Sequence, residues 1–221
     1  MMLASALEAA VRSPRSSRPI FLLRYTSIQN VVQLLTTGRL TLRSPAHWED
    51  RNDAFAIELY RKRVGARNVA AVCFTQASET YHHWKVFAPH GACIEFDKPK
   101  LLRAFNGMPS VRKGAVKYSE IARLRVEPPQ EADLPFLKRH PYRDEREYRV
   151  LHIARGRAAQ APSFAVPLSA IRRITLSPWL TQDQVESERR ALRGIDGCAK
   201  LKVYRTTVLD NTDWKSALSG A

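Results

Sequence analysis

The chain has 221 residues, and its 36 lysines and arginines against 21 aspartates and glutamates give a formal net charge of +15. With 44% hydrophobic and 26% charged residues, the composition excludes a wholly disordered chain, a collagen and a disulfide-stapled mini-protein. No apolar run approaches the ~20 residues of a membrane span. The positive charge favours an anionic partner such as a nucleic acid, a nucleotide or a membrane surface, although an arginine-rich surface without such a partner would carry the same charge.

The length and the distribution of apolar residues predict one domain over residues 19–207. Residues 1–18 are basic and lack the apolar stretch of a secretory signal, so we expect a flexible arm there. Residues 208–221 are expected to be a C-terminal tail. The three cysteines are far apart in the sequence, which favours neither a disulfide framework nor a zinc site and fits a reducing cytoplasm.

Apolar periodicity predicts an α+β fold. Helices are expected at 28–35, 54–60, 81–87 and 181–192, with a further helix ending at 134–138. Strands are expected at 19–26, 39–43, 69–75, 92–96, 111–118, 147–153, 163–166, 171–176 and 200–204. Because strands outnumber long helices and alternate with them irregularly, we expect a single domain with a mixed, mainly antiparallel sheet flanked by short helices.

A charged segment lies at the start of the strand expected at 147–153. If the strand extends back to Glu145, its period of two places Glu145, Glu147 and Arg149 on one face. Two carboxylates and a guanidinium on one face indicate a wet groove or a binding site, because their burial without partners is costly. A solvated sheet face with weak ion pairs is the alternative interpretation.

Two further groups of residues could bind a ligand. Arg24, followed by Tyr25, ends an apolar strand and could grip a phosphate or carboxylate with two parallel hydrogen bonds, or simply extend to water. Thr75 ends another strand, and Tyr81 and Trp84 in the aromatic helix after it could stack on a planar ring, although the spacing of Trp84 is also typical of a core residue.

Metal binding is less favoured by the sequence. The neighbouring residues His82 and His83 cannot face one another on a helix, so we expect no metal there. In the polar loop before residue 54, Asn52 or Asp53 most simply caps a helix. A magnesium-dependent nuclease that uses Asp50, Asp53 and Glu95 remains a less favoured alternative.

Several of these segments occur in an order that resembles the bacterial domain of unknown function 2971 family. The resemblance spans residues 19–204. It consists of Leu23-Arg24-Tyr25-Thr26, Leu40-x-Leu42-x-Ser44-Pro45, Trp48-x-Asp50, Cys73-Phe74-Thr75, Trp84 with Phe87, Gly91-x-Cys93-Ile94-Glu95-Phe96, Val116-x-Tyr118, Lys138 and Glu145-x-Glu147-x-Arg149.

More distantly, the order of Arg24, Thr75 and Glu145-x-Glu147 is similar to that of ADP-ribosyltransferases of the Arg/Ser-Thr/Glu-x-Glu type. The resemblance implies that Arg24 holds the pyrophosphate or ribose of NAD and that Thr75 steadies the active-site strand. It implies that Glu147 stabilises the cationic ribose and that Glu145 orients or deprotonates the acceptor. Tyr25, Tyr81, Trp84 and Arg149 complete the expected NAD-binding set.

The leading hypothesis is therefore an NAD-dependent, cytoplasmic ADP-ribosyltransferase-like protein, a toxin or phage-defence effector that modifies a nucleic acid or a protein. The alternative is a non-catalytic module that binds nucleic acid through its cations. A membrane partner is not expected, and the oligomeric state cannot be deduced from the sequence.

Overall fold

The computed structural model describes residues 20–156 and 161–220, so the expected basic arm at 1–18 lies outside the described residues. The strands are β1 (Phe21–Thr26), β2 (Arg39–Thr41), β3 (Asn68–Thr75), β4 (Ala92–Asp97), β5 (Val111–Ala115), β6 (Lys117–Ser119), β7 (Leu137–Arg139), β8 (Glu147–Ala154), β9 (Ser163–Ala165), β10 (Ile171–Leu176) and β11 (Val203–Arg205). The α-helices are α1 (Ile28–Thr37), α2 (Arg51–Arg63), α3 (Tyr81–Phe87), α4 (Lys98–Arg103), α5 (Ile121–Val126), α6 (Gln182–Gly194) and α7 (Thr212–Ser219). Short 3-10 helices are η1 (Pro45–His47), η2 (Glu131–Phe136), η3 (His140–Glu145) and η4 (Leu168–Ala170).

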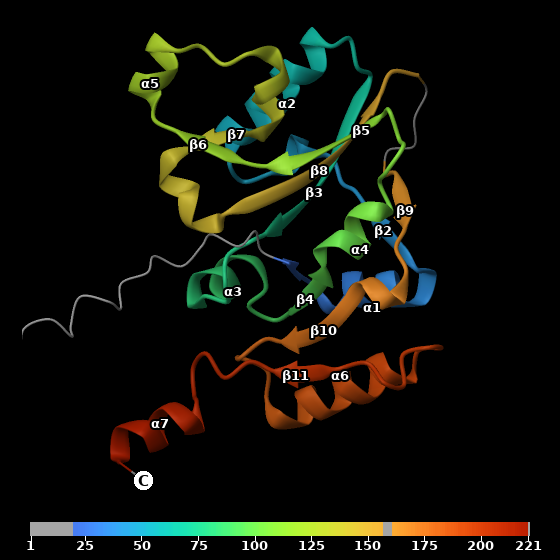
Figure 1. Ribbon diagram of the computed structural model, residues 1–221. Coiled ribbons are helices and arrows are strands. Elements are labelled where there is room, and N and C mark those ends of the chain that lie inside the picture. Colours follow the sequence, from blue (N-terminus) through green and yellow to red (C-terminus); the bar gives the residue numbers. More distant parts are fainter. Residues whose placement is uncertain (1–19, 157–160, 221) are drawn as a thin grey trace, which may run out of the picture.

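A seven-stranded sheet in the order β11-β10-β4-β1-β3-β8-β5 forms the centre of the domain (Figure 1). Neighbouring strands in it are antiparallel, except for the parallel pair of β10 and β11. Two small sheets pair β2 with β9 and β6 with β7. The expected α+β fold with a mixed, mainly antiparallel sheet is confirmed.

Local capping signals define two of the helices. The Ser27 side chain accepts a hydrogen bond from the Asn30 N–H at the start of α1, and Gly38 ends this helix with φ of 62°. Thr181 and Gln184 form the capping box expected at the start of α6. These boundaries follow from the sequence because the capping residues act on their own neighbours.

Other elements differ from the prediction. Helix α2 begins at Arg51 because Asp50, and not Asn52 or Asp53, caps its first N–H groups. The strand expected at 111–118 is divided into β5 and β6, and the expected helix at 134–138 is a 3-10 turn with an internal proline, followed by β7. Helices α4, α5 and α7 were not predicted, and α7 lies in the segment expected to be a tail.

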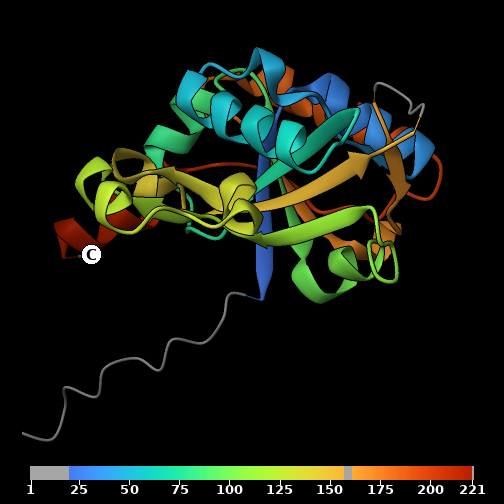
Figure 2. The ribbon, with the colours of Figure 1, turned by 90° about the horizontal axis from the view of Figure 1, so that it is seen from above.

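The two faces of the sheet pack against different helices. Val72 and Ile94 belong to the largest core, together with residues of α1, α4 and α6. Ala71, which points to the opposite face from Val72, packs with Ile57 of α2, and Leu23 packs with Trp84 of α3. Figure 2 shows α2 and α4 on opposite sides of the sheet. Within the described residues, no helix is both long and apolar enough to cross a membrane.

The sheet has a weak join between β1 and β3. Strand β1 pairs with β4 at six positions, and β3 pairs with β8 at eight. Between β1 and β3, the register holds only one pair, Leu23 with Thr75. Strands β1 and β3 therefore separate beyond this pair, and the residues on either side of the join are those that the sequence indicated as a site.

Candidate active site

Thr75 and Glu147 lie directly opposite one another on neighbouring strands. Thr75 ends β3, Glu147 begins β8, and the antiparallel register pairs the two residues. The same register pairs Thr75 with Leu23 of β1. Because paired residues share a face of the sheet, both side chains belong to the face that carries Leu23 and Arg149. The sheet register thus brings together two residues that are far apart in the sequence.

Thr75 fixes the turn that leads into β8. Its hydroxyl donates a hydrogen bond of 2.5 Å to the Glu145 carbonyl and accepts one from the Ala77 N–H. The Gln76 N–H donates to the Arg146 carbonyl at 3.0 Å. These bonds hold residues 145–147 against the end of β3.

The backbone of this turn is strained at Arg146. Arg146 has φ of 43° and ψ of 48°, and among the described residues it is the one non-glycine residue with positive φ. This left-handed conformation costs an L-residue about 1–2 kcal/mol. It also ends η3 at Glu145, so Glu145 lies outside β8 and the expected single row of Glu145, Glu147 and Arg149 is wrong for Glu145.

Arg149 is fully buried and uses all of its donors within the protein. Its five N–H groups donate to both carboxylate oxygens of Glu147, to both of Asp53 and to the Pro135 carbonyl. Its guanidinium also lies 5.0 Å from the Trp48 ring centre. The expected role of Arg149 in holding a cofactor is therefore wrong, because no donor remains for a phosphate or a ribose.

Lys138 joins three carboxylates on the other side of this cluster. Its ammonium lies 2.6 Å from Glu145, 3.5 Å from Glu147 and 3.8 Å from Asp53. The cluster of Asp53, Lys138, Glu145, Glu147 and Arg149 thus combines three acids with two bases, a formal charge of −1. Glu145 is its most accessible carboxylate, with a side chain that is 20% exposed against 6% for Glu147.

The surroundings shift the pKa values of the two glutamates in opposite directions. Burial would raise the pKa of Glu147, but the Arg149 guanidinium and the Lys138 ammonium outweigh it and hold the pKa below its usual value. Burial raises the pKa of Glu145, and its bond to Lys138 offsets this only in part. When the environments of two carboxyl groups separate their pKa values, the group with the lower pKa can act as a fixed negative charge and the group with the higher pKa can accept a proton.

Arg24 is a half-buried cation without an acidic partner among the described residues. One of its N–H groups donates to the Cys73 carbonyl at 3.2 Å. Cys73 lies beyond the single register pair of β1 and β3, so this side chain bridges the two strands where the backbone pairing has ended. Burial lowers the pKa of Arg24, and the nearby Arg43 lowers it further. Arg43 itself donates to Asn30 in the first turn of α1, which holds no acidic residue. Two neighbouring guanidinium groups with no carboxylate between them favour an anionic ligand.

Arg24 and the glutamates are not in contact. Arg24 points to the face opposite that of Leu23 and Thr75, and no ion pair of the described residues joins it to Glu145 or Glu147. The structure therefore brings Thr75, Glu145 and Glu147 together and places Arg24 across the join between β1 and β3.

The expected aromatic residues fall into two groups. Trp84 is fully buried, and its indole N–H donates to Glu79 at 2.6 Å, so the expectation that it stacks on a ligand is wrong and its core interpretation holds. Tyr81 is 43% exposed and meets Trp179 edge to face. Tyr25 is half-buried and stacks on His83 at 5.4 Å, so it reaches the surroundings of the site.

His83 is a further residue of this region that the sequence did not indicate. Its Nδ1 bonds the Thr80 hydroxyl, and its buried Nε2 has no hydrogen-bond partner among the described residues. Burial lowers the pKa of His83, although the Glu145 carbonyl opposes the shift. Lys138 and Arg43 were also missed as site residues, and Asp53 was expected only as a helix cap or as an acid of the less favoured nuclease. Each of them acts through contacts with other segments, which a local motif does not show.

The acids proposed for a nuclease do not form a metal site. Asp50 caps α2, Asp53 binds Arg149, and Glu95 pairs with two arginines of β10. Within the ranges that the structure describes, no group of three or more His, Cys, Asp or Glu residues is arranged to hold a metal ion. Each of these carboxylates is therefore explained by a contact within the chain.

Comparisons with known proteins give a distant structural likeness. No family model matches the chain, so the expected membership of the domain of unknown function 2971 family finds no support there. No curated protein matches it either. A solved structure of Thermus sp. 2.9 DarT in complex with ADP-ribosylated ssDNA has a TM-score of 0.45 and 14% identity, and the alignment covers 90% of this chain and 97% of that one. A second, of Thermus sp. 2.9 DarT in complex with NAD+, has a TM-score of 0.44 and 13% identity, with 90% and 99% covered.

Proposed function

We propose that the chain is an ADP-ribosyltransferase that uses NAD as substrate and a nucleic acid as acceptor, with Glu145 and Glu147 at the reacting centre. The observation that carries the proposal is the pair of glutamates where β8 begins. Glu145 lies in the turn before the strand, held by Thr75 and Lys138. Glu147 is the first residue of the strand, and the two carboxyl groups differ in pKa. A fixed carboxylate stabilises the positive charge that develops on a ribose as its glycosidic bond breaks.

The two glutamates have different roles in this proposal. Glu147, which is buried and kept ionised by Arg149 and Lys138, stabilises the ribose as the bond from its anomeric carbon to the nicotinamide nitrogen breaks and the electron pair leaves with nicotinamide. Glu145, which is more accessible and has the higher pKa, accepts the proton of the acceptor group as the new bond to the anomeric carbon forms.

Arg24 and Arg43, which lie across the join between β1 and β3 from the glutamates, are assigned in this proposal to the diphosphate of NAD, away from the reacting carbon of the ribose. The Arg24 guanidinium is half-buried and has no carboxylate partner among the described residues, so a phosphate oxygen would stabilise its charge in a way that the apolar side chains of its strand do not. The net charge of +15 supports a nucleic acid as acceptor, because neutralised phosphates add affinity that does not depend on sequence. A toxin or phage-defence role would follow from modification of nucleic acid in a cell.

The test is the release of nicotinamide from NAD and the transfer of labelled ADP-ribose to single-stranded DNA and RNA oligonucleotides. We expect Glu147→Gln and Glu145→Gln to lower the rate by at least about 100-fold, while Glu127→Gln, at an exposed helix pair with Arg123, keeps it. Thermal unfolding shows whether each variant is folded. Full activity in a folded Glu147→Gln variant contradicts the proposal.

A non-catalytic module that binds nucleic acid is the second candidate, and the same charge favours it. It predicts oligonucleotide binding that weakens steeply with salt, together with no consumption of NAD. That combination of results would replace the transferase proposal.

A further inference from the structure

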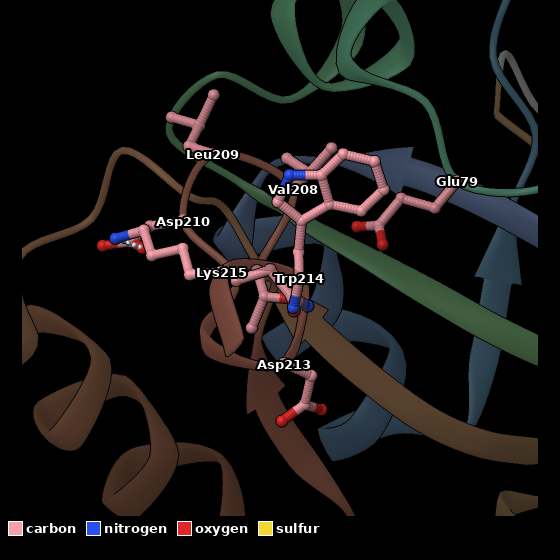
Figure 3. A pocket seen from close by; sticks show the side chains of 9 residues that line it. Glu79, Val208, Leu209, Asp210, Asp213, Trp214 and Lys215 are labelled. Carbon is pink, nitrogen blue, oxygen red and sulfur yellow. Dashed lines mark hydrogen bonds and ion pairs between the residues drawn. The ribbon is translucent and has the colours of Figure 1, made fainter. Parts of the chain in front are cut away.

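A cavity of about 670 Å³ lies between the segment before α3 and the segment that contains α7 (Figure 3). Its lining includes Glu79, Val208, Leu209, Asp210, Asp213 and Trp214. None of these side chains belongs to the cluster around Arg149, so the cavity is a second candidate site.

An exposed indole forms one side of this cavity. Trp214 is 67% exposed, although large aromatic side chains are usually buried. Its backbone N–H is fixed by the Asn211 side chain, which caps α7 at 2.7 Å. The backbone of Trp214 is therefore fixed in the first turn of α7, and most of its ring surface is open to a ligand.

A carboxylate is held in place at the other side. One oxygen of Glu79 accepts the hydrogen bond from the buried Trp84 indole N–H, which anchors this side chain to the core. Its second oxygen is left for a ligand, and Figure 3 shows the Glu79 carboxylate beside the cavity. A carboxylate that is already oriented loses less entropy when it binds.

The charge of the lining is opposite to that of the chain. Three carboxylates, those of Glu79, Asp210 and Asp213, face one ammonium, that of Lys215, which gives a local charge of −2 in a chain of +15. Asp210 pairs with Lys215 at 2.6 Å, and this leaves Glu79 and Asp213 without compensation from the lining. Such a lining repels phosphates and attracts a cation.

We propose that this cavity binds an arginine side chain of a partner protein. A planar guanidinium stacks on an indole face and at the same time donates in-plane hydrogen bonds to a carboxylate, which a lysine ammonium cannot do. The Trp214 ring supplies the face, Glu79 and Asp213 supply the acceptors, and Val208 and Leu209 contact the methylene groups. The site is independent of NAD and of the transferase proposal.

Fluorescence anisotropy with a labelled Gly-Gly-Arg-Gly-Gly peptide tests this assignment on the full chain. The matched peptide has citrulline, which is isosteric with arginine but uncharged, in place of arginine. We expect the arginine peptide to bind at least about ten-fold more tightly, because a charged hydrogen bond and the cation–aromatic contact are both lost with citrulline. Equal binding of the two peptides, or no binding of either, overturns the proposal.

Variants locate the binding to this cavity. Trp214→Ala and Asp213→Asn should each weaken the arginine peptide about five-fold or more. Phe55→Ala is the matched control, because Phe55 is equally exposed, at 66%, on the distant helix α2. A single-stranded DNA oligonucleotide gives the opposing test. If Trp214→Ala weakens the oligonucleotide and not the peptide, the cavity is a base-stacking site and the proposal is wrong.

Discussion

Asp53 and Arg149 are 96 residues apart in the sequence, yet two N–H groups of the Arg149 guanidinium donate to the two carboxylate oxygens of Asp53, and both side chains are buried. Through this contact helix α2 is tied to β8, and the same guanidinium holds Glu147. A buried arginine needs compensation by acids, and it has two of them here. The position of the candidate catalytic glutamate therefore depends on a residue of a different helix.

Replacement of Asp53 by Asn should destabilise the protein by about 2–4 kcal/mol, because Arg149 loses one of its two counter-charges while it remains buried. Urea unfolding measures this effect. Asp133→Asn is the control, since Asp133 pairs with Lys117 where both side chains are well exposed, and its loss should cost less than about 1 kcal/mol. Equal effects of the two substitutions would show that the buried pair contributes no more than a surface pair.

Replacement of Arg24 by Met should raise stability and remove anion binding. Arg24 is half-buried without an acidic partner among the residues described, so an apolar side chain of similar length suits its surroundings better, by about 1 kcal/mol. Isothermal titration with ADP-ribose, together with urea unfolding, measures both effects. Arg39→Met is the matched control, because the Arg39 guanidinium bonds Ser163 at the surface. A destabilised Arg24→Met variant with unchanged affinity would assign Arg24 a structural role.

Replacement of Arg146 by Gly should stabilise the protein by about 0.5–1 kcal/mol, because glycine adopts the left-handed conformation without strain. Arg146→Val should destabilise it by about 1–2 kcal/mol, since a β-branched residue is least tolerant of positive φ. Guanidinium unfolding of the two variants gives the comparison. If both substitutions have the same sign, the strain at Arg146 is not what determines stability at this turn.

Stability should fall as the pH is lowered from 7.5 to 5.5, and His83 should contribute to this fall. Burial lowers the pKa of His83, so the unfolded chain binds its proton more readily than the folded protein does. The stability that this histidine contributes is therefore present above the unfolded value of about 6.5 and is lost as the pH falls towards the folded pKa. His152, whose pKa is also lowered by burial, acts in the same direction.

Melting temperatures of His83→Gln across this range should depend less on pH than those of the wild type. His82→Gln is the comparison, because His82 is the exposed neighbour on the same helix and its charge only adds to the effect of burial on the pKa of His83, so its loss should change the slope less than His83→Gln does. A wild-type slope in His83→Gln would contradict the assignment.

The sequence predicted those features that depend on neighbouring residues. Ser27 and Gly38 bound α1 as expected, because each acts on the backbone of its own helix. The burial of Asp53 was missed because the helix was expected to begin at residue 54, although the spacing of Asp53 to Ile57 and Tyr60 places it on the buried stripe of α2. The sequence does not show that Arg149 lacks a free donor, because its partners Asp53 and Pro135 come close to it only in the folded protein.

The single register pair between β1 and β3 leaves the two parts of the central sheet joined by few backbone contacts, although one hydrophobic core packs against both. Arg24 belongs to the half with β4 and β10, whereas Thr75 and Glu147 belong to the half with β8 and β5. A molecule bound by Arg24 and the glutamates together would connect the two parts of the sheet across the pairing of β1 with β3. Amide protons along β1 and β3 should then exchange more slowly when it is bound, and the ligand itself would supply part of the cohesion of the sheet.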